Sequence, residues 1–169
     1  VVGLDGNVVV IVSTDGVLVF DTNGTPAAAT AVLAEIRALT PQPVKYVVNS
    51  HWHWDHWYGT EVYQDAFPGV QVIAHEATRA MMAGPAIEFN RPGLDTQLPG
   101  YLKALEQNLA SLDAASADAR RLKALLDDDR AFLEQKRRVR HALPTLTYTG
   151  QLTLHLGDRE IHVRHHDRA

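Results

Sequence analysis

The chain has 169 residues, of which 46% are hydrophobic, enough for one folded domain and too many for a disordered chain. Its formal net charge of −4 gives no electrostatic reason to expect nucleic acid or an anionic membrane as partner. The sequence contains no cysteine, which excludes disulfides, thiolate ligands and a cysteine nucleophile, and which leaves the cellular compartment open. No apolar run approaches the roughly 20 residues that a membrane helix needs.

The N-terminal third predicts strand, helix and strand in alternation. Two apolar runs, 8–12 and 17–20, flank an Asp-Gly turn and predict a hairpin. Thr25 and Pro26 are typical of a helix N-cap and first helical residue, and apolar positions at helical spacing follow them. The apolar run 44–48 predicts the next strand. This order indicates an α/β fold.

The remaining chain contains a long helical region between shorter elements. Residues 84–100 are rich in Pro and Gly and are expected to form a loop. Leucines at helical spacing predict helices over 101–141, with a break at 113–118 that makes them a pair. We expect this region, about 100–141, to be an insertion within one domain. The other predicted elements are helix 61–66, strand 70–74, helix 76–82 and strands 146–149, 152–156 and 161–164.

Four potential metal ligands, His51, His53, Asp55 and His56, lie within six positions directly after the strand at 44–48. Residues two apart in an extended segment point the same way, so His51 and His53 can face one metal. Asp55 and His56 follow at a turn and can face a second metal beside it. Imidazole nitrogen and carboxylate oxygen suit zinc, and iron or manganese would also fit. A surface cluster or an expression tag is the alternative, but a tag would lie at a terminus and lack the aspartate.

The pattern His-x-His-x-Asp-His after an apolar strand resembles the signature of the metallo-β-lactamase superfamily. The segments before it, 6–21 and 43–50, are similar to those that precede the motif in this family, and the likeness lies mainly within residues 5–75. The resemblance implies an αββα sandwich, in which residues 1–169 form a single partial domain with the helical insertion. It also implies a binuclear site with two zinc ions.

In that family, the residues matching His51 and His53 bind the first metal, and those matching Asp55 and His56 bind the second. Two metals roughly 3.5–4 Å apart can share a water and lower its pKa toward about 7, so that it attacks a carbonyl, sulfur or phosphorus centre. Asp55 would bind a metal, orient this nucleophile and shuttle its proton, which makes it the expected catalytic residue. Members with diiron redox chemistry usually carry Glu at the position of His53, so this histidine favours hydrolysis over electron transfer.

The resemblance therefore implies a metal-dependent hydrolase of a small ester, thioester, lactone or β-lactam. One alternative is a nucleic-acid phosphodiesterase of the same superfamily, which the negative net charge disfavours. Another is an inactive metal-binding or interaction fragment. The expected partner is a small-molecule substrate, with neither nucleic acid nor a membrane favoured. The helical insertion is a possible contact for a homo-oligomer, a lid over the site, or a layer packed on the sandwich.

The family takes a third histidine, a bridging aspartate and a final histidine from later segments. This sequence ends at 164–169, just before a histidine of the expected pattern, so we expect it to be a fragment in which each metal keeps two protein ligands. His165 or His166 in a shifted register is the alternative third ligand.

Other residues near the motif have more than one interpretation. Asp21 is expected to accept a hydrogen bond from a ligand histidine, or else to form a turn. His75 ends the predicted strand 70–74 and is expected to be structural, with an approach to the pocket as the alternative. The aromatic residues of the motif can form a pocket wall or pack around the metal loop, and Tyr58 can narrow the site. The basic run 136–140 is expected to be a solvated, ion-paired face. The aromatic residues concerned are Trp52, Trp54, Trp57 and Tyr58.

Overall fold

The computed structural model describes residues 6–166. Its larger sheet contains five strands in the order β1-β2-β3-β4-β5. β1 and β2 form the predicted antiparallel hairpin, whereas β2, β3, β4 and β5 run parallel, so their carboxyl ends meet at one edge. This edge carries the motif. The strands are β1 (Val9–Ser13), β2 (Gly16–Phe20), β3 (Val44–Val48), β4 (Gln71–His75) and β5 (Leu146–Tyr148).

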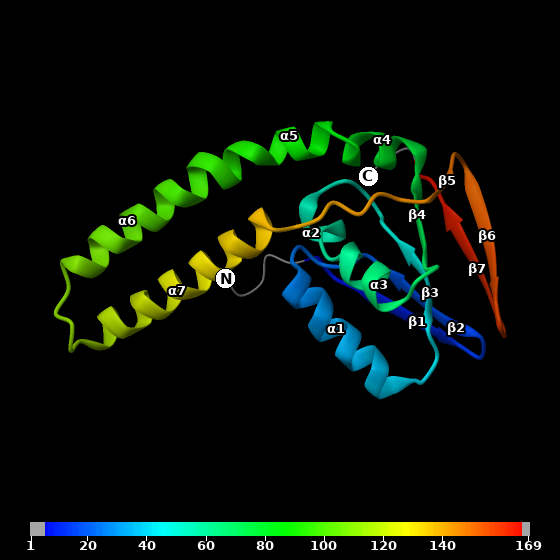
Figure 1. Ribbon diagram of the computed structural model, residues 1–169, viewed down its shortest axis with the longest axis horizontal. Coiled ribbons are helices and arrows are strands. Elements are labelled where there is room, and N and C mark those ends of the chain that lie inside the picture. The colour runs from blue at the N-terminus through cyan, green and yellow to red at the C-terminus, as the bar shows by residue number, and fades with distance from the viewer. Residues whose placement is uncertain (1–5, 167–169) are drawn as a thin grey trace.

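Helices α1 (Pro26–Leu39) and α3 (Thr60–Ala66) cover one face of this sheet (Figure 1). The hydroxyl of Thr25 accepts a hydrogen bond from the backbone N–H of Ala28, and Pro26 occupies the first turn, as the sequence predicts. The buried side chains of α1, Ala29, Leu33 and Ile36, join those of β2, β3 and β4 in one hydrophobic core.

The other face of the sheet packs against a second, two-stranded sheet. Its strands β6 (Gln151–Leu156) and β7 (Arg159–Arg164) form an antiparallel hairpin. A second core lies between the two sheets, so the described part of the chain shows a helix layer and two sheet layers (Figure 1). This arrangement confirms the predicted α/β sandwich. The buried members of this core are Leu18, Val48, Ile73, Leu154, Leu156 and Val163.

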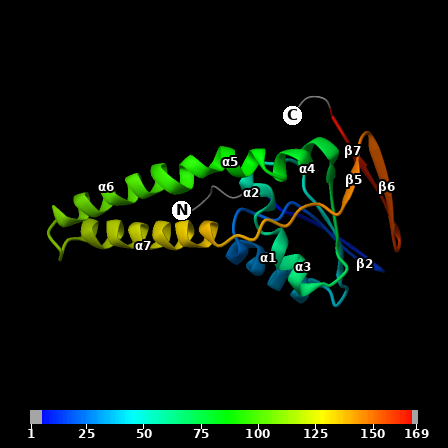
Figure 2. The ribbon, with the colours of Figure 1, turned by 45° about the horizontal axis from the view of Figure 1, so that its top comes forward.

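Helices projecting from the sandwich form a long antiparallel hairpin, which we call the helical arm (residues 85–137; Figures 1 and 2). Leu102 and Leu105 pack against Leu126 and Leu133 in a core of their own. The predicted break lies between the last two helices. No helix within residues 6–166 is long and apolar enough to cross a membrane. After α4 (Glu76–Met82), the arm comprises α5 (Pro85–Pro92), the π-helical turn η1 (Gly93–Gln97), α6 (Leu98–Ala110) and α7 (Ala117–Arg137).

The prediction of a loop at 84–100 is wrong, because this segment is helical almost throughout. Pro85 occupies the first turn of α5, where the missing backbone N–H has no helical partner to lose. Pro99 lies in the first turn of α6, directly after the wider π-helical turn η1. Pro92 lies within α5, and the helix continues through the wider turn η1. The prolines that suggested a loop therefore lie at the start of α5, at the end of α5 and at the start of α6.

Candidate metal centre

The motif lies at the edge where the parallel strands end. Asp21 follows β2, and its backbone N–H donates to the Val48 carbonyl at 2.8 Å. Asn49 follows β3 and donates to the Ile73 carbonyl at 2.9 Å. The chain then runs through His51 and His53 into the single-turn helix α2 (Trp54–Trp57). The sheet thus places two polar segments, far apart in sequence, beside each other.

The backbone carbonyl of His56 is fixed by three donors. The Thr22 N–H lies 2.9 Å from it, and the Thr22 hydroxyl and the Asn49 side-chain amide each lie 3.3 Å from it. Thr22 and Asn49 are buried, so water does not compete for these bonds. The end of α2 is therefore tied to both β2 and β3.

Asp21 orients the His56 ring. Its Oδ2 lies 2.7 Å from Nδ1 of His56, and its two oxygens accept hydrogen bonds from the backbone and the hydroxyl of Ser50, each at 2.7 Å. Its backbone has φ 61°, a left-handed conformation that aspartate tolerates better than most residues. Asp21 therefore fills both roles considered from the sequence. It forms the turn after β2, and it accepts a hydrogen bond from His56, a predicted metal ligand.

The three motif imidazoles lie together. The ring centroid of His51 is 4.8 Å from that of His53 and 4.1 Å from that of His56. Burial lowers the pKa of His51, and the neighbouring His56 and His53 lower it further, against the opposing effect of the carboxylates of Asp21 and Asp55. A lowered pKa favours the neutral imidazole, which is the form that binds metals.

The donor atoms of Asp55 and His56, and the distance between them, show whether this pair could bind a metal ion. The Asp21 carboxylate can only accept, so Nδ1 of His56 donates to it, and a neutral ring then carries its lone pair on Nε2. This atom lies 3.3 Å from Oδ2 of Asp55. Two ligand atoms at about 2.0–2.2 Å from one tetrahedral zinc lie about 3.4 Å apart. The pair therefore fits a cation in donor type and spacing.

A complete metal-binding group is not formed by the described side chains. Within residues 6–166, no three His, Asp or Glu side chains converge closely enough to bind one metal ion as they stand. The motif therefore supplies pairs of donors rather than a closed site.

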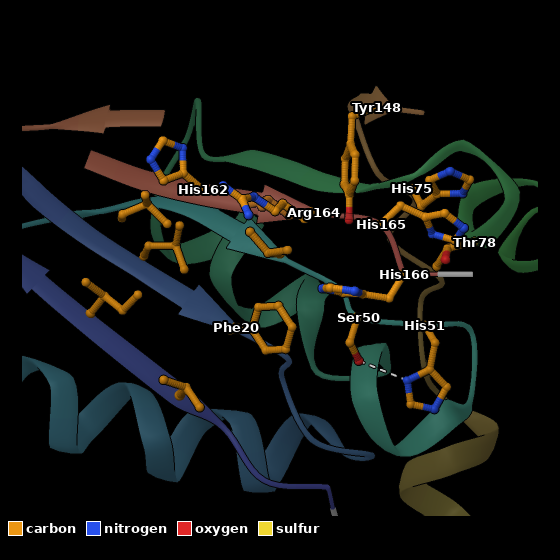
Figure 3. A pocket seen from close by; sticks show the side chains of 16 residues that line it. Phe20, Ser50, His51, His75, Thr78, Tyr148, His162, Arg164, His165 and His166 are labelled. Atoms are coloured by element: carbon orange, nitrogen blue, oxygen red, sulfur yellow. Dashed lines mark hydrogen bonds between the residues drawn. The ribbon is translucent and has the colours of Figure 1, made fainter. Parts of the chain in front are cut away.

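A cavity of about 630 Å³ opens beside His51, between the two sheets (Figure 3). Its inner wall is apolar and includes Leu18, Phe20 and Val163. Its rim is polar, and Figure 3 shows Ser50 bonded to His51, with Nδ1 of His51 at 2.9 Å from the Ser50 hydroxyl. The candidate centre thus lies at the mouth of an apolar cavity.

His75 and His165 occupy the opposite rim of this cavity (Figure 3). Their rings stack at 3.9 Å. Nε2 of His75 lies 2.8 Å from the Thr149 carbonyl, and its Nδ1 accepts from the Ala77 N–H, so both ring nitrogens are used within the fold. Both interpretations of His75 therefore hold, because its ring nitrogens bond within the fold and its side chain also lines the cavity. His165 is placed against His75 rather than among the motif side chains.

The aromatic residues of the motif fall into two groups. Trp57 and Tyr58 are buried with Met82, and neither lines the cavity beside His51. Tyr58 therefore does not narrow that cavity, because its ring turns into the core. Trp52 and Trp54 instead contact the helical arm, through Phe89 and Phe132. All four aromatic side chains therefore pack within the fold, and none of them lines the cavity beside His51.

The basic run 136–140 is only partly the solvated face that was predicted. Arg137 and Arg138 pair with Glu134, and Arg140 pairs with Asp65 at 2.6 Å. Lys136, by contrast, is buried under aromatic rings. Sequence reasoning missed this residue, since helical spacing alone does not show which lysine of a basic run turns inward. It also missed Ser50, whose place directly before the motif was the available signal.

Comparison with known proteins places the chain in a family. A model of the metallo-β-lactamase superfamily matches residues 1–166, and the chain belongs to this superfamily. No curated protein matches it.

Two solved structures that the chain matches with a TM-score of 0.50 or more show the same fold. A metallo-β-lactamase from Pontibacter korlensis matches with a TM-score of 0.52 at 18% identity, over 92% of this chain and 46% of its own. A HARLDQ-motif mutant of a metallo-β-lactamase from Cronobacter sakazakii matches with a TM-score of 0.50 at 20% identity, over 89% of this chain and 43% of its own. FIM-1 from Pseudomonas aeruginosa, in a mono-zinc form, matches with a TM-score of 0.40 at 17% identity, over 44% of this chain and 32% of its own. The chain spans less than half the length of each of these structures.

Proposed function

We propose that this chain forms part of a metal-dependent hydrolase that uses a metal-activated water. The observation that carries the proposal is the pairing of Asp55 with His56, 3.3 Å apart, with Asp21 fixing the far side of the imidazole. A ligand histidine whose other nitrogen is bound by a carboxylate is a common feature of protein metal sites. Superfamily membership gives independent support.

Each motif residue has a role in this proposal. His51 and His53 would bind one metal, and Asp55 and His56 a second, with zinc as the expected ion. When bound, the metals would supply an activated water and polarise the bond under attack. Asp55 would orient the nucleophile and carry its proton, because its carboxylate faces the same side as Nε2 of His56. Ser50 and Asp21 would keep the rings of His51 and His56 in position.

The proposed substrate is a small ester, thioester, lactone or β-lactam. The cavity beside His51 has about 630 Å³, a size typical of small-molecule sites, and its inner wall is apolar. Such a wall suits the uncharged body of a small substrate, while the polar rim faces its reactive carbonyl.

Metal binding is the first test of the proposal. The untagged chain, depleted of metal, is titrated with zinc in competition with a chromophoric chelator. We expect at least one zinc per chain, and we expect His53→Ala or Asp55→Ala to weaken binding at least about tenfold. His155→Ala is the control, because this exposed histidine lies on β6. Absence of zinc binding by the chain, or equal binding by all the variants, would refute the proposed metal site.

Hydrolysis is the second test. The zinc-loaded chain is assayed against esters, thioesters, lactones and β-lactams, with the Asp55→Ala variant alongside. Turnover that requires both zinc and Asp55 supports the proposal. Zinc binding without turnover on the whole panel would instead favour a metal-binding fragment.

A further inference from the structure

The helix that carries Asp55 and His56 is too short to be stable alone. α2 spans Trp54–Trp57, a single turn, and an isolated helix of this length does not persist in water. Its carboxyl end is tied to the sheet through the His56 carbonyl. Its amino end, with Trp54 beside Asp55, needs a support of its own.

The helical arm provides contacts at this end. The ammonium of Lys136, in the last turn of α7, lies 3.0 Å from the ring centroid of Trp54. The Phe132 ring, one turn earlier on α7, meets Trp54 edge-on at 5.8 Å. From α5, Phe89 meets Trp52 edge-on at 5.4 Å. Both tryptophans that alternate with the motif histidines are therefore contacted by the arm.

Lys136 is unusual for a lysine near the end of a helix. The residue is only 8% exposed, and its ammonium also lies 5.1 Å from the ring centroid of Phe132 and 5.6 Å from that of Tyr58. An ammonium over aromatic faces is attracted by their negative charge density, and the attraction grows when water is excluded. Lys136 thus joins the base of the arm to Trp54 and Tyr58, at the two ends of α2.

We propose that Lys136 is a positioning residue for the candidate metal centre. By fixing Trp54, it sets the start of α2 and with it the carboxylate of Asp55. This inference rests on the proposed metal site for its functional meaning, but its structural part can be tested without metal. It also gives the arm a role, since a movement of α7 against the sandwich would reach Asp55 through Trp54.

Hydrogen exchange of the metal-free protein tests the structural part. The reporters are the amides of His56 and Tyr58, which donate to the His53 and Trp54 carbonyls at 3.0 and 3.2 Å. Lys136→Met removes the charge and keeps much of the apolar stem. We expect faster exchange at residues 54–58 and unchanged exchange in α1. Lys136→Arg keeps a positive charge at this position. The amides of residues 54–58 should therefore exchange more slowly in this variant than in Lys136→Met.

Lys123→Met is the matched control on the same helix. Lys123 is exposed and pairs with Asp127, far from α2 in sequence and fold, so its loss should leave residues 54–58 unchanged. Unchanged exchange at 54–58 in Lys136→Met would overturn the proposal. An equal rise of exchange at 54–58 and in α1 would also overturn it, because Lys136 would then stabilise the whole chain rather than α2 in particular.

Zinc affinity tests the functional part. We expect Lys136→Met to weaken zinc binding about tenfold, a loss typical of residues that orient metal ligands, and Lys123→Met to leave it unchanged. Equal affinity of Lys136→Met and the parent chain would overturn the functional part. If the parent chain binds no zinc, the proposed metal site fails, and hydrogen exchange still decides whether Lys136 positions α2.

Discussion

Asp21 shows how one side chain serves both the fold and the candidate site. It ends β2 in a left-handed conformation, receives two hydrogen bonds from Ser50, and accepts from His56. Its carboxylate is buried, and a buried acceptor is costly to lose once its donors are in place.

Asp21→Asn should weaken zinc binding by about tenfold to a hundredfold. The amide can present its nitrogen to Nδ1 of His56, which would favour the wrong tautomer of this ring. Competition with a chelator measures the change. Asp15→Asn is the control, because Asp15 is an exposed turn residue at the opposite end of the hairpin, paired with Lys45. Unchanged affinity in Asp21→Asn would show that Asp21 acts on the fold alone.

His141 is a histidine whose contribution to stability depends on pH. Its ring packs against Trp57 and Tyr58 at 5.3 and 5.1 Å, and burial lowers its pKa, with the Glu61 carboxylate acting in the opposite direction. The unfolded chain therefore takes up a proton at a higher pH than the folded one. The free energy of unfolding should fall as the pH drops below about 6.5.

Urea unfolding between pH 5 and pH 7.5 measures this effect. His141→Gln removes the titrating ring, so its stability should fall less over the same range than that of the parent chain. The comparison is between two chains because all other contributions to the pH dependence are common to both. An identical pH dependence of the two chains would contradict the prediction.

At the scale of elements, Gly59 sets the distance between α3 and the loop after β2. A Cβ built at this position would clash with the Thr22 carbonyl oxygen and with Cβ of Ala29. Both neighbours belong to the packed core or its backbone and cannot give way easily.

Gly59→Ala should therefore destabilise the chain by about 2–3 kcal/mol. Gly100→Ala is the matched control, because a Cβ added to Gly100 in α6 would meet no described atom within 4 Å apart from its own helix backbone and chain neighbours. Alanine should stabilise that helix by about 0.5–1 kcal/mol. Chemical denaturation of both variants measures the difference. Similar effects of the two substitutions would refute the close approach at Gly59.

Alanine substitutions at two neighbouring leucines of α7, one buried and one partly exposed, would test how the arm packs. Leu126 is 2% exposed and packs against α6, whereas Leu125 is 37% exposed. Leu126→Ala should cost about 2–4 kcal/mol of arm stability, and Leu125→Ala less than about 1 kcal/mol. Helical circular dichroism during denaturation measures both. Equal losses would mean that α6 and α7 pack through another face.

At the scale of the whole molecule, the outer part of the arm has a core separate from those of the sandwich, whereas Ile87 at the base of the arm packs with Trp57 and Tyr58. The leucines of the arm pack among themselves, while two further cores lie on the two faces of the large sheet. Units with separate cores can open separately, with different free energies. We expect the amides of α6 and of the first half of α7 to exchange faster than those of β2 and β3. Hydrogen exchange measured peptide by peptide checks this, and uniform protection across both would contradict it.

The sequence by itself determined the local elements and the motif. Hydrophobic periodicity is a local property, so it predicted the strands that form the large sheet, the helix capped by Thr25 and the break within the helical pair. The motif is also local, because His51, His53, Asp55 and His56 follow one strand, and its spacing led directly to the superfamily that comparison confirmed. Their roles as metal ligands remain a prediction.

Tertiary structure decided what lies against the motif. That Asp21 meets His56 follows from the parallel pairing of β2 with β3, which brings together residues 35 apart in sequence. That Lys136 lies on Trp54 follows from the angle at which the arm leaves the sandwich, and no pattern within α7 encodes that angle. The helices at 85–100 were mistaken for a loop because proline has opposite meanings at the start and in the middle of a helix, and only the packed structure shows where each helix starts.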